Sequence, residues 1–205
     1  MLGYRDSGMP DTEANANPDN FANAELDEAV DRLIEIIRRE RPQVVITYPD
    51  DQGSYQHPDH LRVHDISVPA FERAGKPSHR PDLGKAWEPS KLYYSMWSRR
   101  RIEARHAAFL ERGLESPYDE RWFDRPSQDD RITTRIPIDG FASVRSDGLR
   151  AHATQVDPAS PFWFGLPDDV EHAIHPFDDY VLVKGNQPEE RPESDLFAGI
   201  AVATG

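Results

Sequence analysis

The pattern of apolar and polar positions predicts helices and strands that follow one another along the first half of the chain. Apolar residues recur at helical spacing from Ala24 to Arg39, with charged residues between them, which is typical of an amphipathic helix. The β-branched run from Gln43 to Tyr48 predicts a short buried strand. Because a helix, a tight turn and a strand follow in succession, the pattern favours an α/β fold.

The later part of the chain continues this pattern less regularly. A second helix is expected from Pro58 to about Ala74, kinked or divided at Pro69. Further strands are expected at 91–97, 131–138 and 180–183, and further helices at 99–112 and 141–154. Pro137 favours a sheet edge or strand end for residues 131–138. We expect one domain over residues 1–205, with 185–205 as an extended C-terminal tail.

Charge and cysteine content restrict the class of partner and the kind of metal site. The 205 residues carry a formal net charge of -13 and no cysteine. Nucleic-acid binding requires clustered basic residues, so a nucleic-acid partner is not expected. Without thiols, disulfides and Cys-ligated zinc are excluded, and any metal must be held by His, Asp or Glu.

Hydropathy gives no sign of a membrane partner. The sequence has no apolar run approaching the roughly 18 residues of a bilayer-crossing helix, and it opens without a signal-peptide pattern. A soluble cytoplasmic protein that acts on a small molecule is the expectation. The oligomeric state is left open by the sequence.

One short stretch concentrates the groups that move protons and bind metals. Tyr55-Gln56-His57-Pro58-Asp59-His60 places a phenol, two imidazoles and a carboxylate within about one and a half helical turns. His64 lies four residues beyond His60, so these two histidines could share one helix face. A three-histidine zinc site built from His57, His60 and His64 is therefore one hypothesis, although the Glu of a His-Glu-x-x-His motif is lacking.

A purely structural interpretation of the same stretch is favoured by the spacing alone, because short motifs recur by accident. His57 could cap the helix, Pro58 suits a first helical position, and the Asp59 carboxylate would face the positive end of the helix dipole. Tyr55 could be a packing residue and His60 a hydrogen-bonded surface residue. Spacing alone leaves both interpretations open.

The motif, together with several other segments, resembles the LmbE/PIG-L-type zinc-dependent N-deacetylases, and within them the mycothiol S-conjugate amidases. The similarity extends over nearly all of the chain. Besides Tyr55-x-His-Pro-Asp-His60 it includes Asp6-Ser7-Gly8, Ser90–Tyr94, Leu149–Pro158 and Leu196–Ile200. The resemblance implies a Rossmann-like α/β fold, a three-layer sheet with helices, and a zinc cofactor. It also implies a thiol-sugar conjugate as substrate.

Roles for individual residues are carried over from that resemblance. It implies that His60 is a zinc ligand, and that His57 stabilises the tetrahedral intermediate or donates a proton. Asp59 would orient His57 and raise its basicity, and Tyr55 would help to polarise the scissile carbonyl. Asp6 is expected to contact hydroxyl groups of the substrate.

The sequence departs from the family pattern in one respect. Family members begin with a strand leading into Ala-His-Pro-Asp-Asp-Glu, which provides two further zinc ligands and the general base. Here the His-Pro-Asp at His57–Asp59 is the only one. We therefore expect an N-terminally incomplete domain that lacks the first strands of the sheet and that is inactive or poorly folded alone. In-frame codons upstream for the missing motif would test this expectation.

Three functional hypotheses remain at this point. The first is a zinc-dependent amidohydrolase that cleaves the amide between glucosaminyl-inositol and the acyl-cysteine of mycothiol S-conjugates. The second is an N-acetylglucosaminyl-inositol deacetylase with the same mechanism and a smaller acyl group. The third is a non-catalytic remnant or binding module that keeps the sugar-contacting surface without a complete metal site.

Overall fold

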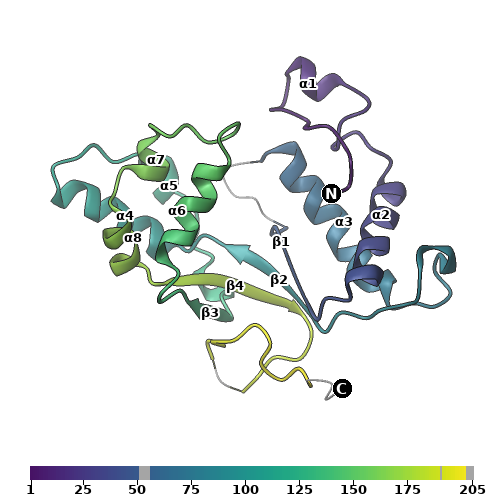
Figure 1. Ribbon diagram of the computed structural model, residues 1–205. Helices are drawn as coiled ribbons and strands as arrows, with labels where there is room; N and C mark the ends of the chain where they lie inside the picture. Colours follow the sequence, from purple (N-terminus) through teal and green to yellow (C-terminus); the bar gives the residue numbers. More distant parts are fainter. Residues whose placement is uncertain (51–55, 190, 202–205) are drawn as a thin grey trace. The chain divides into compact units, whose positions relative to one another are not determined.

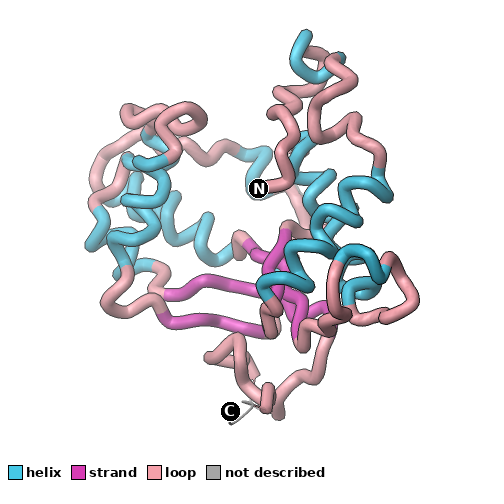
Figure 2. Tube along the Cα trace, turned by 45° about the vertical axis from the view of Figure 1, so that its right-hand side comes forward, coloured by secondary structure: helices cyan, strands magenta, loops and turns pink. Residues whose placement is uncertain are grey.

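The protein has a mixed α/β fold in which four strands form one sheet of order β1-β2-β4-β3 (Figures 1 and 2). A computed structural model describes residues 1–50, 56–189 and 191–201. Strands β1 and β2 pair in parallel, with Val44 opposite Lys91 and Thr47 opposite Tyr94. Strands β3 and β4 pair antiparallel. The α/β class predicted from the sequence is confirmed, and β3 lies at an end of the strand order, as expected for a strand that contains Pro137.

The chain divides into two compact units, which are described separately. The first comprises Met1–Ser95, Val181–Glu189 and residues 196–201. Its elements are α1 (Glu13–Ala16), α2 (Leu26–Glu40), β1 (Val44–Thr47), α3 (Pro58–Ala74), the 3-10 turn η1 (Pro81–Leu83), β2 (Lys91–Met96) and the C-terminal half of β4 (Phe177–Lys184).

The core of the first unit lies between α2 and α3. The buried apolar stripe predicted for α2 packs against the small and branched residues of α3, in the cluster Ala29, Val30, Ile34, Ile37, Ile66, Ala70 and Ala74. Helix α3 continues through Pro69, so the prediction that the helix could be divided at Pro69 is wrong. The hydroxyl of Ser67 links α3 to the strand, because it accepts a hydrogen bond of 2.9 Å from Thr47 Oγ1 of β1.

A buried arginine fixes the segment that follows α3. Arg38 is 3% exposed, and its guanidinium donates to the carbonyl oxygens of Ala74, Lys76, His79 and Arg80 at 2.6 to 3.0 Å. These four carbonyl groups lie at the end of α3 and in the loop after it, where helical partners are lacking. Arg38 therefore stabilises the connection between α3 and β2 through hydrogen bonds to its backbone.

The second unit comprises Met96–Tyr180 with residues 191–195. Its elements are α4 (Arg99–Glu111), α5 (Glu120–Phe123), η2 (Asp129–Arg131), β3 (Thr134–Pro137), α6 (Ala142–Ala151), α7 (Pro161–Phe164), α8 (Asp168–Ile174) and the N-terminal half of β4. This unit has a cluster of its own, formed by Ile102, Ala108, Phe109, Tyr118 and Leu166. Among the described residues, no helix combines the length and the apolar character that crossing a membrane requires.

Candidate functional site

The predicted polar stretch lies at the N-terminal end of α3, a short distance along the chain from the C-terminal end of β1. Helix α3 begins at Pro58, and His57 is its N-cap: the Nδ1 atom of His57 accepts a hydrogen bond of 3.2 Å from the backbone amide of Asp59. Proline is favoured at a first helical position because it has no amide hydrogen to leave unpaired. The helix start predicted from the sequence is therefore confirmed, with His57 acting as a cap.

Capping also determines the tautomer of the neutral His57 ring. Because Nδ1 accepts a hydrogen bond, a neutral His57 ring has its hydrogen on Nε2. That Nε2–H group can donate to an oxygen that gains negative charge. The capping interpretation and the catalytic interpretation of His57 are thus compatible.

The Asp59 carboxylate is held by a residue far away in the sequence. Ser7 is fully buried, and its backbone amide donates to Asp59 Oδ2 at 3.1 Å while its hydroxyl donates to Asp59 Oδ1. The same hydroxyl accepts a hydrogen bond of 2.8 Å from the amide of Ala22. Sequence reasoning missed Ser7, although Asp6-Ser7-Gly8 was one of the segments that carried the family resemblance.

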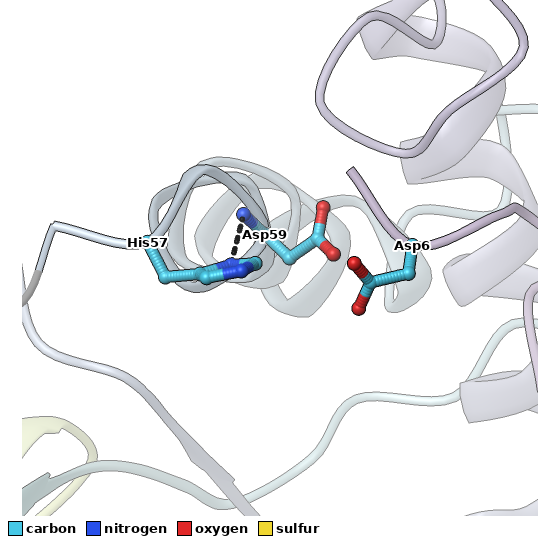
Figure 3. A group of neighbouring side chains, drawn as sticks. All are labelled: Asp6, His57 and Asp59. Carbon is cyan, nitrogen blue, oxygen red and sulfur yellow. Dashed lines mark hydrogen bonds between the residues drawn. The ribbon is translucent and has the colours of Figure 1, made fainter. Parts of the chain in front are cut away.

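Asp6 lies beside these residues and completes a cluster of potential ligands. One ligand atom from each of Asp6, His57 and Asp59 lies within 4.8 Å of the others, and Figure 3 shows the two carboxyl groups turned toward one another. Asp6 Oδ1 accepts a hydrogen bond of 2.8 Å from the amide of Gly8. Two carboxylates at this separation repel each other, and a bound cation would relieve that repulsion.

His60 lies in the first turn of α3, two residues after Pro58. Its ring stacks on Tyr48 with centroids 4.2 Å apart, and it lies 5.3 Å from the His57 ring. Burial, followed by the nearby His57, lowers the pKa of His60 from its ordinary value. A lowered pKa favours the neutral imidazole, which is the form that coordinates metals.

Two other predicted residues have different surroundings. His64 Nδ1 lies 3.2 Å from the carbonyl oxygen of Tyr48, and the His64 ring meets Tyr94 edge-on at 5.3 Å. It is not in the cluster formed by Asp6, His57 and Asp59. Tyr55 lies outside the described residues, so its predicted role stays a prediction.

The sequence is similar to known proteins over nearly its whole length. Residues 1–71, which contain Asp6, His57, Asp59 and His60, match the family described as PIG-L: GlcNAc-PI de-N-acetylase. A mycothiol S-conjugate amidase of Streptomyces coelicolor is 41% identical, over 97% of this chain and 70% of the relative.

Proteins of a second name are similar to nearly the same extent. A 1D-myo-inositol 2-acetamido-2-deoxy-alpha-D-glucopyranoside deacetylase of Geodermatophilus obscurus is 38% identical, over 96% of this chain and 68% of the relative. A protein of the same name from Rhodococcus erythropolis is 39% identical, again over 96% and 68%. The chain is thus similar to all three relatives to nearly the same extent, whereas the activities in their names differ.

Proposed function

The chain belongs to the PIG-L family of de-N-acetylases, and from this premise we propose that it is a zinc-dependent hydrolase of mycothiol S-conjugates. The bond cleaved is the linear amide between glucosaminyl-inositol and the acyl-cysteine carrying the conjugated group. The observation that carries this proposal is the 41% identity, over 97% of the chain, with a mycothiol S-conjugate amidase. Hydrolysis of a carbon–nitrogen bond other than a peptide bond is common to the names of all the relatives described.

The biosynthetic deacetylase is a second candidate because relatives of that name are 38% and 39% identical over a similar span. Both reactions add water to an amide carbonyl and release an amine. They differ in the acyl group, which is acetyl in the deacetylase and an S-substituted acylcysteine in the amidase. Relative turnover of the two substrates distinguishes them.

The donor atoms at the start of α3 suit a zinc ion. Zinc accepts imidazole nitrogen and carboxylate oxygen, and the cluster of Asp6, His57 and Asp59 offers both kinds of atom within 4.8 Å. His57 itself is not counted as a ligand in this proposal, because its Nδ1 accepts from the Asp59 amide and its Nε2 carries the hydrogen. Family resemblance assigns the ligand role to His60, whose neutral form is favoured by burial. A zinc ion held there would supply Lewis acidity for the attacking water and the scissile carbonyl.

The chain's own residues have separate tasks in this proposal. The Nε2–H group of His57 donates to the carbonyl oxygen as negative charge develops on it. Asp59, whose carboxylate is bound by Ser7, donates its backbone amide to His57 Nδ1 and so orients the His57 ring. Asp6 accepts hydrogen bonds from sugar hydroxyls, and Tyr55 polarises the carbonyl.

The test of activity uses the purified protein. An S-conjugate of mycothiol and N-acetylglucosaminyl-inositol are each supplied, and the free amine released is measured. Faster turnover of the S-conjugate supports the amidase, and faster turnover of the N-acetyl sugar supports the deacetylase. Replacing His57 by Ala should lower kcat by about 10²- to 10⁴-fold while zinc content is retained. No turnover of either substrate would overturn the proposal in favour of a binding module.

The metal assignment is tested on the same protein by zinc analysis. We expect stoichiometric zinc, lost in His60→Ala and retained in Asp6→Asn. Loss in Asp6→Asn with retention in His60→Ala would instead assign the metal to Asp6, His57 and Asp59. Zinc content that is unaffected by both substitutions would contradict a metal site at the start of α3.

A further inference from the structure

The second unit contains a cavity of its own. It has a volume of about 300 Å³ and is lined by residues between Trp97 and Asp178. Two indole rings, Trp97 and Trp163, and the aliphatic side chains of Ile138 and Leu149 form its apolar part. Cavities of about 300 Å³ and larger with mainly apolar walls and a few polar groups are typical binding sites for small molecules.

Arg101 of α4 lines this cavity and is 6% exposed. Its Nε atom is buried without a hydrogen-bond partner, and among the described residues its guanidinium makes no ion pair. The guanidinium of Arg101 lies over the ring of Trp97, with Cζ 4.6 Å from the ring centroid. A buried charge without a counter-ion is costly, and a cation–π contact offsets only part of that cost.

The neighbouring Arg105 also has a buried Nε without a hydrogen-bond partner, but Arg105 and Arg145 each form an ion pair, which Arg101 does not among the described residues. Arg105 Nη2 lies 2.8 Å from Glu171 and donates at 2.8 Å to the carbonyl oxygen of Phe162. Arg145 is paired with Asp178. Two of the acidic side chains in the cavity wall are therefore already matched by a cation.

The third acidic side chain of the wall is matched as well. Asp168 Oδ1 accepts a hydrogen bond of 2.7 Å from Ser146, and its other oxygen lies 3.7 Å from Arg150. His172 Nε2 faces Asp139 at 3.4 Å. Within the described part of the cavity, Arg101 is thus the cation that has no anionic partner.

The surroundings of Arg101 favour an added anion. Burial lowers the pKa of Arg101 to about 10, and the charges of Arg145 and Arg105 act in the same direction, while the more weakly acting charges of Asp178 and Glu171 oppose them. At neutral pH the guanidinium is still charged. An anion beside it would offset both the burial and the repulsion from the two neighbouring arginines.

We propose that this cavity binds a small carboxylate, with its anionic group on Arg101 and its apolar body against Trp97 and Trp163. A guanidinium and a carboxylate match in a planar, bidentate geometry. A single negative charge suits one unmatched cation. A phosphate dianion would bring a second charge close to Glu171, Asp178 and Asp168.

Two sources of such a carboxylate are distinguishable. The first source is the reaction proposed above, because hydrolysis of an amide gives an amine and a carboxylic acid. The acid released there is an S-substituted N-acylcysteine, and this source rests on the proposed function. The other is a carboxylate unrelated to that reaction. Both share the anionic group and an apolar body.

Calorimetric titration of the full chain tests the cavity itself. The probes are benzoate, benzamide as its uncharged counterpart, and inorganic phosphate. Benzoate should bind more tightly than either of the other two. Arg101→Met should weaken benzoate binding on the order of tenfold or more, whereas Arg100→Met, which changes an exposed neighbour on the same helix, should leave it unchanged. Equal binding of benzoate and benzamide, or no benzoate binding, would overturn the proposal.

A second variant tests the cavity independently, in case Arg101→Met does not fold. Leu149→Trp fills the cavity and leaves Arg101 in place, so it should also abolish benzoate binding while circular dichroism stays that of the wild type. Benzoate binding by both variants as tight as in the wild type would also contradict the proposal.

N-acetyl-S-benzylcysteine identifies the source of the carboxylate. If this compound binds more tightly than benzoate, the reaction product is supported as the occupant. If it binds equally or more weakly, an unrelated carboxylate is supported. In either case the ligand occupies the same cavity. Because calorimetry requires no turnover, an inactive protein that binds benzoate would refute the proposed function and leave the carboxylate site standing.

Discussion

Ser7 holds both carboxylate oxygens of Asp59, one through its hydroxyl and the other through its backbone amide at 3.1 Å. The two residues are 52 positions apart, so this contact fastens the N-terminal segment to the start of α3. Through the backbone amide of Asp59, the contact also helps to fix the ring of His57. A buried serine therefore positions the residues that are proposed to handle the proton.

Replacing Ser7 by Ala should destabilise the protein by about 1–3 kcal/mol, because the Asp59 carboxylate and the Ala22 amide both lose a buried partner. Urea unfolding at neutral pH measures the change. Ser78→Ala is the matched control, since Ser78 is exposed and should change stability by less than about 0.5 kcal/mol. Equal effects of the two substitutions would show that the Ser7 hydroxyl contributes nothing specific.

Replacing Arg38 by Met should cost about 3 kcal/mol or more, because four backbone carbonyl groups lose a charged donor within the buried region. The same urea titration detects it. Arg39→Met provides the comparison on the adjacent position, where the side chain is 59% exposed and pairs with Glu40. If both arginine variants unfold at the same urea concentration, the loop after α3 does not depend on Arg38.

Replacing His64 by Ala should leave the zinc content at the wild-type level. His64 faces the carbonyl oxygen of Tyr48 and the ring of Tyr94, and it is not a member of the cluster with Asp6, His57 and Asp59. Zinc analysis beside His60→Ala provides the measurement. Equal loss of zinc in both histidine variants would support the three-histidine site instead.

The long elements could be predicted from the sequence because periodicity and end signals agree. Helix α2 was expected at 24–39 and spans Leu26–Glu40, and α3 begins at the predicted Pro58. Strand β4 begins at Phe177, before the predicted Tyr180. Asp178 and Asp179 are poor strand formers, and ion pairs with Arg145 and Arg135 hold them in the strand. A local sequence pattern cannot reveal these partners, because they lie more than 30 residues away along the chain.

The candidate site was predictable only in part for the same reason. The His57–His60 stretch is local and dense, so its residue types alone indicated proton or metal chemistry. The contact between Ser7 and Asp59 depends on folding across 52 positions, and a lone serine carries no such signal. The unpaired state of Arg101 likewise emerges only when the partners of its neighbours are known.

Asp179 provides a prediction about pH. This 4% exposed carboxylate lies 2.9 Å from His175 Nε2 and 3.1 Å from Arg135 Nε. Burial alone would raise the pKa of Asp179, but hydrogen bonds from His175 and Ser98, together with the charges of His175 and Arg135, outweigh it. The pKa of Asp179 therefore lies below the ordinary value of 3.8.

A carboxyl group whose pKa is lower in the folded state contributes stability above its unfolded pKa, and that stability is lost as the pH falls through the folded pKa. Asp179→Asn should therefore be less stable than the wild type by a margin that is largest at about pH 5 and above and that shrinks as the pH falls below about 4. Urea unfolding at a series of pH values measures this margin. Asp124→Asn, at an exposed position, should show no such trend. A margin for Asp179→Asn that is constant with pH would mean that the ionised carboxylate does not stabilise the strand, and that only the shape of the side chain matters there.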